Sequence, residues 1–321
     1  MKKTLTTILL SAASLLAADM AALNERLILD MPQEAVYGQR TTALMEASPG
    51  DDETLIWVGD GADRIAVYAK ELNALADTDF ETQARSFLGD YSRDGITYHI
   101  TKLNDNVFYA IRQDNPEQAS GADFFGIALI RHTDGSLIRL TILFAPNHIT
   151  APDKCRDWSE KALRNLRIGP GTRRLEAYCD VISFFSEMYF EVPVPEGYAR
   201  TINHGCDFTY TTYCKLGKLK APADYFGIYL GSHPDFEKPD GATSIKSTAA
   251  GKKATWYCTE PREGTFVAES CMRLTSLFSF EEAPVYMHLI IVAPSAEARE
   301  AQIQNLSHIK RVKKPTPKTK D

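Results

Sequence analysis

Residues 140–146 read LTILFAP, and residues 288–294 read HLIIVAP. Both segments are apolar runs of strand length that end in Ala-Pro, and they lie 148 residues apart in the chain. Proline has no N–H to give to a ladder, so each run is predicted to be a strand that stops at the dipeptide. The pair therefore predicts an internal duplication, with Ala145-Pro146 superposed on Ala293-Pro294.

A helical segment follows each of these strands. Residues 153–168 read DKCRDWSEKALRNLRI, and residues 295–309 read SAEAREAQIQNLSHI. Apolar residues recur at helical spacing in both segments, which predicts an amphipathic helix in each. Asp153 and Ser295 are expected to cap these helices, because their side chains can accept hydrogen bonds from the first free backbone N–H groups.

The segments before the two strands also correspond. Residues 29–40 (LDMPQEAVYGQR) and 190–200 (FEVPVPEGYAR) open the two halves, and strand pairs with period-two alternation follow in each. A predicted helix over residues 79–88 interrupts the first half, whereas the second half has a Pro- and Gly-rich loop over 233–251. The sequence predicts an α+β fold of two tandem units, each a mostly antiparallel sheet with a C-terminal helix packed on it.

The predicted division of the chain follows from this pattern. Gly169, Pro170 and Gly171 break the first C-terminal helix and mark the joint between the halves. The expected order is a signal peptide, a first α+β domain, a second α+β domain and a basic disordered tail, at residues 1–18, 23–169, 176–309 and 310–321.

The arrangement resembles the PsbP/Mog1-like α/β sandwich family. In the second half the resemblance rests on FEVPVPEGYAR at residues 190–200 and on HLIIVAP leading to QIQNLSHI at 302–309. In the first half it rests on LTILFAP and on EKALRNLRI at residues 160–168. The resemblance implies an accessory, assembly or binding role, and it supplies no catalytic residue.

Composition and charge narrow the class of protein. The chain has 321 residues, of which 44% are hydrophobic and 24% charged, which is an ordinary globular balance. Its net charge of −6 is an average, because Lys2 and Lys3 carry +2 and residues 310–321 carry +5, so the remaining body carries −13. Such a body repels phosphate backbones, which argues against nucleic-acid binding. The basic tail is expected to be a solvated end, or a weak tether to an acidic partner.

The N-terminus predicts export. Residues 1–18 read MKKTLTTILLSAASLLAA, in which two lysines precede an apolar run that is too short to cross a bilayer. Cleavage is expected after Ala17, Ala18 or Ala22, and the alternative is a buried N-terminal helix. The mature protein is expected to be soluble, secreted or periplasmic, with no transmembrane segment after cleavage.

Cysteine usage agrees with export. An even number of cysteines in an exported chain predicts disulfides. The strongest single prediction is a disulfide between Cys155 and Cys179. An extended segment between Cys206 and Cys214 would keep those two cysteines too far apart to bond with each other. The six cysteines expected in disulfides are Cys155, Cys179, Cys206, Cys214, Cys258 and Cys271.

No motif predicts catalysis, a metal or a cofactor. His204 and Cys206 could form a thiolate pair, but a cysteine in a disulfide is the expected state. The segment from Asp60 to Asp63 could bind calcium, but it lacks the alternating carboxylates of a calcium loop, so a solvated turn is preferred. Further carboxylates cluster at 51–53 and 281–282. We expect no catalytic, cofactor-binding or metal-binding residues.

Aromatic residues crowd the early part of the second half. A sheet face that exposes them could bind glycans or peptides, and Tyr210, Tyr213 and Trp256 are the predicted ligand-binding residues. The alternative is packing in the core. The expected function is a non-catalytic binding or accessory protein of the bacterial periplasm or cell surface, whose partner is an unknown envelope protein, a peptide or a glycan. A secreted hydrolase with a site assembled from distant residues is the alternative, and a structural envelope protein is a third possibility.

Overall fold

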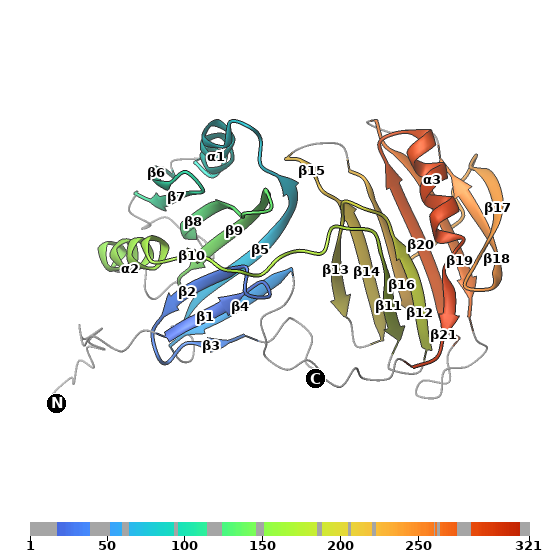
Figure 1. Ribbon diagram of the computed structural model, residues 1–321, viewed down its shortest axis with the longest axis horizontal. Coiled ribbons are helices and arrows are strands. Elements are labelled where there is room, and N and C mark those ends of the chain that lie inside the picture. The colour runs from blue at the N-terminus through green and yellow to red at the C-terminus, as the bar shows by residue number, and fades with distance from the viewer. Residues whose placement is uncertain are drawn as a thin grey trace, which may run out of the picture.

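The computed structural model describes most of the chain. The described residues are 18–38, 52–59, 64–92, 96–113, 124–145, 151–184, 188–204, 207–219, 223–259, 261, 264–274 and 284–314. The predicted signal peptide lies outside them except for Ala18. Over these residues the protein is mostly antiparallel β, with four sheets and three short helices (Figure 1).

The described residues of the first half of the chain form ten strands. They are β1 (Ala18–Ala22), β2 (Leu27–Met31), β3 (Val36–Tyr37), β4 (Glu53–Val58), β5 (Ile65–Leu75), β6 (Tyr98–Asn104), β7 (Val107–Arg112), β8 (Phe124–Arg131), β9 (Ser136–Leu143) and β10 (Arg167–Ile168).

In the second half, eleven strands lie within the part of the chain that the structure describes. They are β11 (Tyr178–Phe184), β12 (Met188–Val194), β13 (Tyr198–His204), β14 (Phe208–Lys215), β15 (Gly217–Lys218), β16 (Tyr225–Gly231), β17 (Thr243–Ala249), β18 (Lys252–Cys258), β19 (Phe266–Arg273), β20 (Tyr286–Ala293) and β21 (Lys310–Val312).

The three helices begin with different caps. Asp79 and Ser295 accept hydrogen bonds from the backbone N–H groups three residues on, and so cap α1 (Phe80–Gly89) and α3 (Ala296–Leu306). The expected cap at Asp153 is wrong, because α2 (Pro152–Arg164) begins earlier, with proline in its first turn and no side-chain cap. None of these helices has the length and hydropathy that a membrane-spanning helix needs.

The two large sheets have the same strand order. Seven strands of one follow the order β3-β4-β5-β9-β8-β7-β6, and those of the other follow β13-β14-β16-β20-β19-β18-β17. The strands that precede the two Ala-Pro dipeptides, β9 and β20, are therefore both fourth. Residue by residue the match shifts, since Ala293 faces the core whereas Phe144, and not Ala145, does so in the first half. Pro146 lies outside the described residues.

Each half also has a three-stranded sheet, in the orders β1-β2-β10 and β11-β12-β21. Both sheets extend past the predicted domain limits. The strand β1 precedes residue 23 and pairs with β2 along its whole length. Residues 310–312 of the predicted disordered tail form β21, where Lys310 Nζ lies 2.6 Å from Glu191 Oε1. Two of the three expected cleavage positions, Ala18 and Ala22, lie within β1.

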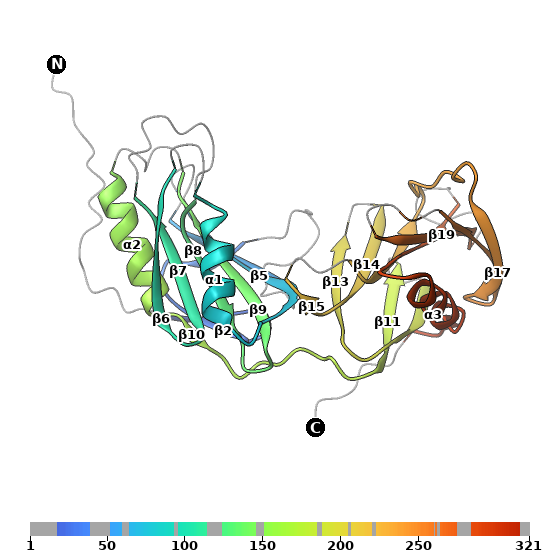
Figure 2. The same ribbon diagram turned by 90° about the horizontal axis from the view of Figure 1, so that it is seen from above.

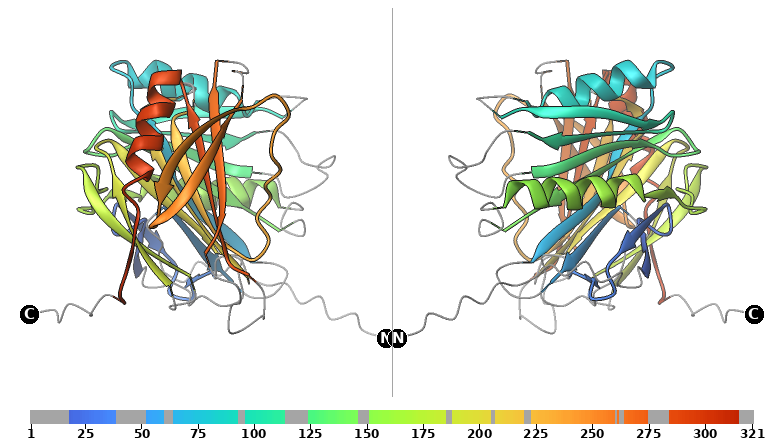
Figure 3. Two further views of the ribbon diagram at one scale, coloured as in Figure 1. Left: turned by 90° about the vertical axis from the view of Figure 1, so that its right-hand side faces the viewer. Right: turned by 90° about the vertical axis from the view of Figure 1, so that its left-hand side faces the viewer.

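Each large sheet has an inner face, which packs against the three-stranded sheet of its half, and an outer face. In the first half α2 packs on the inner face and α1 covers part of the outer face, so that the two helices lie on opposite sides (Figure 3). In the second half α3 packs on the inner face. Figure 2 shows α3 and β11 on one side of this sheet, and no described helix lies on the other.

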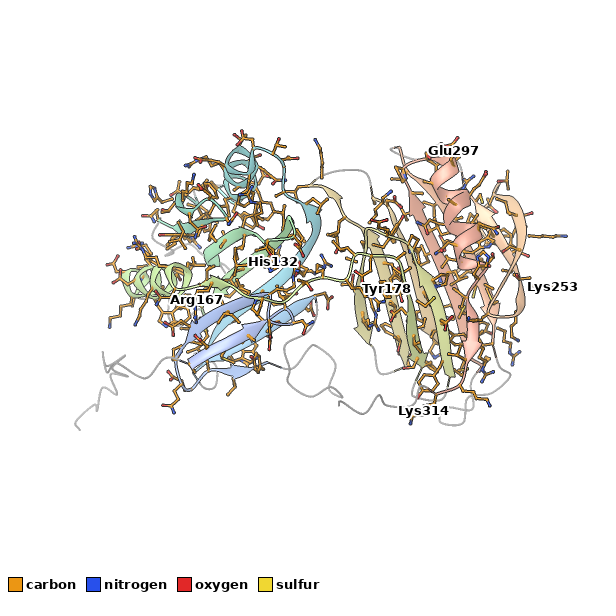
Figure 4. The ribbon with its side chains drawn as sticks, viewed as in Figure 1. His132, Arg167, Tyr178, Lys253, Glu297 and Lys314 are labelled. Carbon is orange, nitrogen blue, oxygen red and sulfur yellow. The ribbon has the colours of Figure 1, made fainter. Side chains whose placement is uncertain are left out.

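The halves meet at the linker that follows β10. The backbone N–H groups of Gly169 and Gly171 donate to the carbonyls of Arg26 and Glu25, in the left-handed turn that follows β1. A Cβ at either glycine would lie about 2 Å from a backbone oxygen of this turn. His132, which belongs to the first half, contacts the carbonyl of Gly169, and Tyr178 begins the second half (Figure 4). The strand β15 makes a second contact between the two halves, since it pairs in parallel with the end of β5.

Candidate ligand-binding face

The outer face of the second large sheet is the candidate site. Ladder registers place Tyr210, Tyr229, His288 and Cys271 side by side on β14, β16, β20 and β19. Residues two apart on a strand share a face, so Tyr225 and Glu269 belong to the same surface. We call the five residues Tyr210, Tyr225, Tyr229, Glu269 and His288 the tyrosine face.

Glycines on β16 let the rings lie down on the sheet. A Cβ at Gly227 would lie 2.3–2.8 Å from Oη, Cε2 and Cζ of Tyr210, so the ring of Tyr210 occupies the place of a side chain there. Gly231 likewise makes room for Tyr229, whose ring stacks on that of Phe208 with centroids 5.6 Å apart. The rings therefore cover backbone with one side and turn the other side away from the sheet.

A single carboxylate lies in this aromatic surface. Nε2 of His288 lies 2.9 Å from Oε2 of Glu269, and because a carboxylate only accepts, the imidazole donates. The Glu269 side chain is 28% exposed, whereas that of His288 is 4% exposed. The pair thus presents a fixed carboxylate to solvent.

The loop over residues 232–242, which we call the strap, crosses one side of this face. The ring of Phe236 packs on His288 and Tyr257, with centroids 5.2 and 6.0 Å apart. Nζ of Lys238 lies 5.5 Å from the centroid of Tyr257. The strap therefore covers His288 and β18, and it also reaches β16, where the backbone N–H of His233 donates to Oη of Tyr229 at 3.1 Å.

The Tyr210 hydroxyl and the neighbouring Cys271 thiol are both shifted towards their neutral forms. Burial raises the pKa of the Tyr210 hydroxyl, and the nearby charge of Glu269 raises it slightly further. Burial also raises the pKa of the Cys271 thiol, which faces His288 across the ladder. A neutral thiol is a weaker nucleophile than a thiolate.

The three residues predicted to bind ligand are not brought together. Tyr210 lies on the tyrosine face, but Tyr213 and Trp256 are fully buried on the inner side. Tyr213 donates to Asp180 Oδ2 at 2.6 Å and Trp256 Nε1 donates to Ser247 Oγ at 2.9 Å. Tyr210 and Tyr213 are three residues apart on one strand, so alternation already places them on opposite faces. Neither buried ring can contact a surface ligand.

The predicted disulfides are not formed among the described cysteines. Cys155 lies on the buried side of α2 in the first half and Cys179 is exposed on β11, and neither thiol forms a disulfide. Cys258 faces the core, whereas Cys214 and Cys271 alternate onto the other side of their sheet, and all three are free. Cys206 lies outside the described residues.

Other predicted candidates do not assemble into a site. His204 belongs to β13, and its possible partner Cys206 lies outside the described residues, as do residues 60–63 and 281–282. Glu53 accepts a hydrogen bond from Tyr68 Oη at 2.6 Å. In the part of the chain that the structure describes, no group of three His, Cys, Asp or Glu side chains is placed to hold a metal ion.

A groove of about 200 Å³ lies between α2 and the edge strand β6. Its lining residues are His99, Thr101, Tyr109, Ile111, Gln113, Arg156, Asp157 and Glu160. Two of the charged residues that line the groove already form ion pairs within α2, since Glu160 pairs with Arg164 and Arg156 pairs with Asp153. The groove therefore supports a site less well than the tyrosine face.

Comparison with known proteins adds no relative: no family model, no curated protein and no solved structure matches the chain.

Proposed function

We propose that the chain is a non-catalytic binding protein whose ligand lies on the tyrosine face. The observation that carries this proposal is the contrast between the two outer faces. Phe80, Ala84 and Leu88 of α1 cover the first one. The described residues place a short strap and no helix over the second face, and its partly exposed rings and carboxylate suit a peptide or a glycan.

The fold supports the proposal that the chain is a duplicated α+β unit. The shared strand order, and the C-terminal helix on each inner face, favour two tandem units with a joint at 169–176. We further propose the PsbP/Mog1-like sandwich as their family and the periplasm or cell surface as their compartment, from the signal-like residues 1–18. In this proposal α1 covers the outer face of the first unit, and the corresponding face of the second unit binds a partner.

Site-specific photo-crosslinking in the living cell tests the proposal. Benzoylphenylalanine at position 225, within the tyrosine face, is expected to yield an adduct that mass spectrometry resolves as a peptide, a protein or a glycan. The matched control places the same group at Lys154, an exposed position on α2. An adduct at position 225 no stronger than that at position 154 would contradict the proposed function.

A further inference from the structure

The carboxylate of the tyrosine face is not neutralised by an ammonium or guanidinium group within salt-bridge distance among the described residues. Glu269 contacts His288 through Oε2, and a neutral imidazole is sufficient to make that hydrogen bond. In the ladder Gly227 lies opposite Ile290, and Ile290 lies opposite Glu269. The Tyr210 ring, which lies over Gly227, therefore reaches towards Glu269. The negative charge of Glu269 also raises the pKa of the Tyr210 and Tyr225 hydroxyls, although burial is the larger cause. The carboxylate and both rings therefore belong to one electrostatic environment.

The rings around Glu269 attract positive charge. The faces of aromatic rings carry negative electrostatic potential, so a cation placed over a tyrosine ring is stabilised. The ring of Tyr210 lies on the backbone at Gly227, which leaves its other face for a ligand. A cation over this ring would also approach Glu269 from β14.

The strap already places a cation on this surface. The ammonium of Lys238 lies 5.5 Å from the centroid of Tyr257, and Tyr257 is directly opposite Glu269 in the ladder between β18 and β19. This intramolecular contact lies on the β18 side of Glu269. On the β14 side, Tyr210 offers the same kind of ring, and no described lysine or arginine makes a cation–π contact with it.

We infer that the tyrosine face binds a basic peptide segment, with a lysine or arginine side chain seated between the ring of Tyr210 and the carboxylate of Glu269. The inference rests on the proposed binding function and names its ligand class. Net charge agrees, because the body of the chain carries −13 and attracts cations from a distance. A neutral glycan would gain no charge–charge attraction from Glu269.

Fluorescence anisotropy with two labelled peptides tests the inference on the full mature chain. The probes are Gly-Thr-Lys-Thr-Lys-Thr-Gly and the same peptide with glutamine in place of both lysines. The lysine peptide is expected to bind at least about tenfold more tightly, with a difference that shrinks as salt rises. Equal affinity of the two peptides would overturn the inference.

Matched variants locate the site. Glu269→Gln keeps an acceptor for His288 and is expected to weaken the lysine peptide about tenfold. Tyr210→Leu is expected to weaken it about threefold or more, and Tyr210→Phe to keep it, because only the latter retains a ring. Glu297→Gln, on α3 at the other side of the sheet, is expected to change nothing (Figure 4).

The outcomes separate this inference from the proposed function. If the glutamine peptide or a neutral oligosaccharide binds best and Tyr210→Leu abolishes that binding, the face is a binding site and its cationic selectivity is wrong. If Glu269→Gln and Glu297→Gln weaken the lysine peptide equally, the attraction comes from net charge and the assigned seat is wrong. If no probe binds and the crosslink at position 225 is also absent, both proposals fail.

Discussion

Glu71 accepts a hydrogen bond from Nε of Arg26 at 2.5 Å, and each of these two side chains is only 1% exposed. Arg26 also donates to Asp134 at 2.7 Å and to Ser136. Arg173, from the linker, reaches the second oxygen of Glu71 at 3.4 Å. One buried set of charges thus joins the turn after β1, the strand β5 and the segment that leads to the second half.

Arg26→Gln is expected to lower the free energy of unfolding by about 3–5 kcal/mol, because it removes the positive partner that lies nearest to the buried Glu71 carboxylate. Urea unfolding followed by circular dichroism measures this. The matched control is Arg85→Gln on α1, which breaks an exposed pair with Glu81 and is expected to leave the midpoint unchanged. Equal effects of the two variants would show that burial of the Arg26 network contributes nothing.

The same network predicts a loss of stability in acid. Burial alone would raise the pKa of Asp134, but hydrogen bonds from Arg26 and Ser136 hold the pKa well below its ordinary value. A depressed carboxyl pKa stabilises the fold above the pKa of the unfolded chain, and this stability disappears as pH falls from about 5 towards 2. Glu71 acts in the opposite sense, because burial raises its pKa in spite of Arg173 and Arg26.

Asp134→Asn is therefore expected to be less stable than the parent at pH 7 and to lose less stability on acidification. Unfolding free energies measured from pH 7 to pH 3 check this, since the gap between the two proteins should narrow as the pH falls. A gap that stays constant over this range would mean that Asp134 is not the group responsible.

Local patterns predicted the elements better than they predicted the site. Ser295 caps α3 and the helix at 79–88 is α1, because capping and helical spacing are encoded within a few residues. Arg26 gives no such signal, since its partners Glu71 and Asp134 lie 45 and 108 residues away. The contact between Glu269 and His288 depends on the register of β19 and β20, which sequence alternation alone does not determine.

The fate of the cysteines can be checked by thiol titration of the folded, unreduced protein. Cys179 is exposed, whereas burial raises the pKa of Cys155 and of Cys214 to about 11, which keeps their thiolate populations small. Cys179→Ser is expected to remove one rapidly reacting thiol, and the matched Cys155→Ser is expected to remove none. An unchanged number of rapidly reacting thiols after Cys179→Ser would mean that Cys179 is oxidised or shielded from the reagent.

Gly227→Ala tests the geometry of the tyrosine face without removing any of its residues. The new Cβ would lie 2.3 Å from Oη of Tyr210, so the ring must move, and its far end can do so without disturbing the backbone. The variant is expected to fold and to bind the lysine peptide at least about threefold more weakly, because the cation loses its ring. Gly89→Ala is the matched control, since a Cβ there meets nothing within 4 Å. If the NMR spectrum of Gly227→Ala shows a displaced Tyr210 ring and the variant still binds the lysine peptide with full affinity, this ring is not part of the binding site.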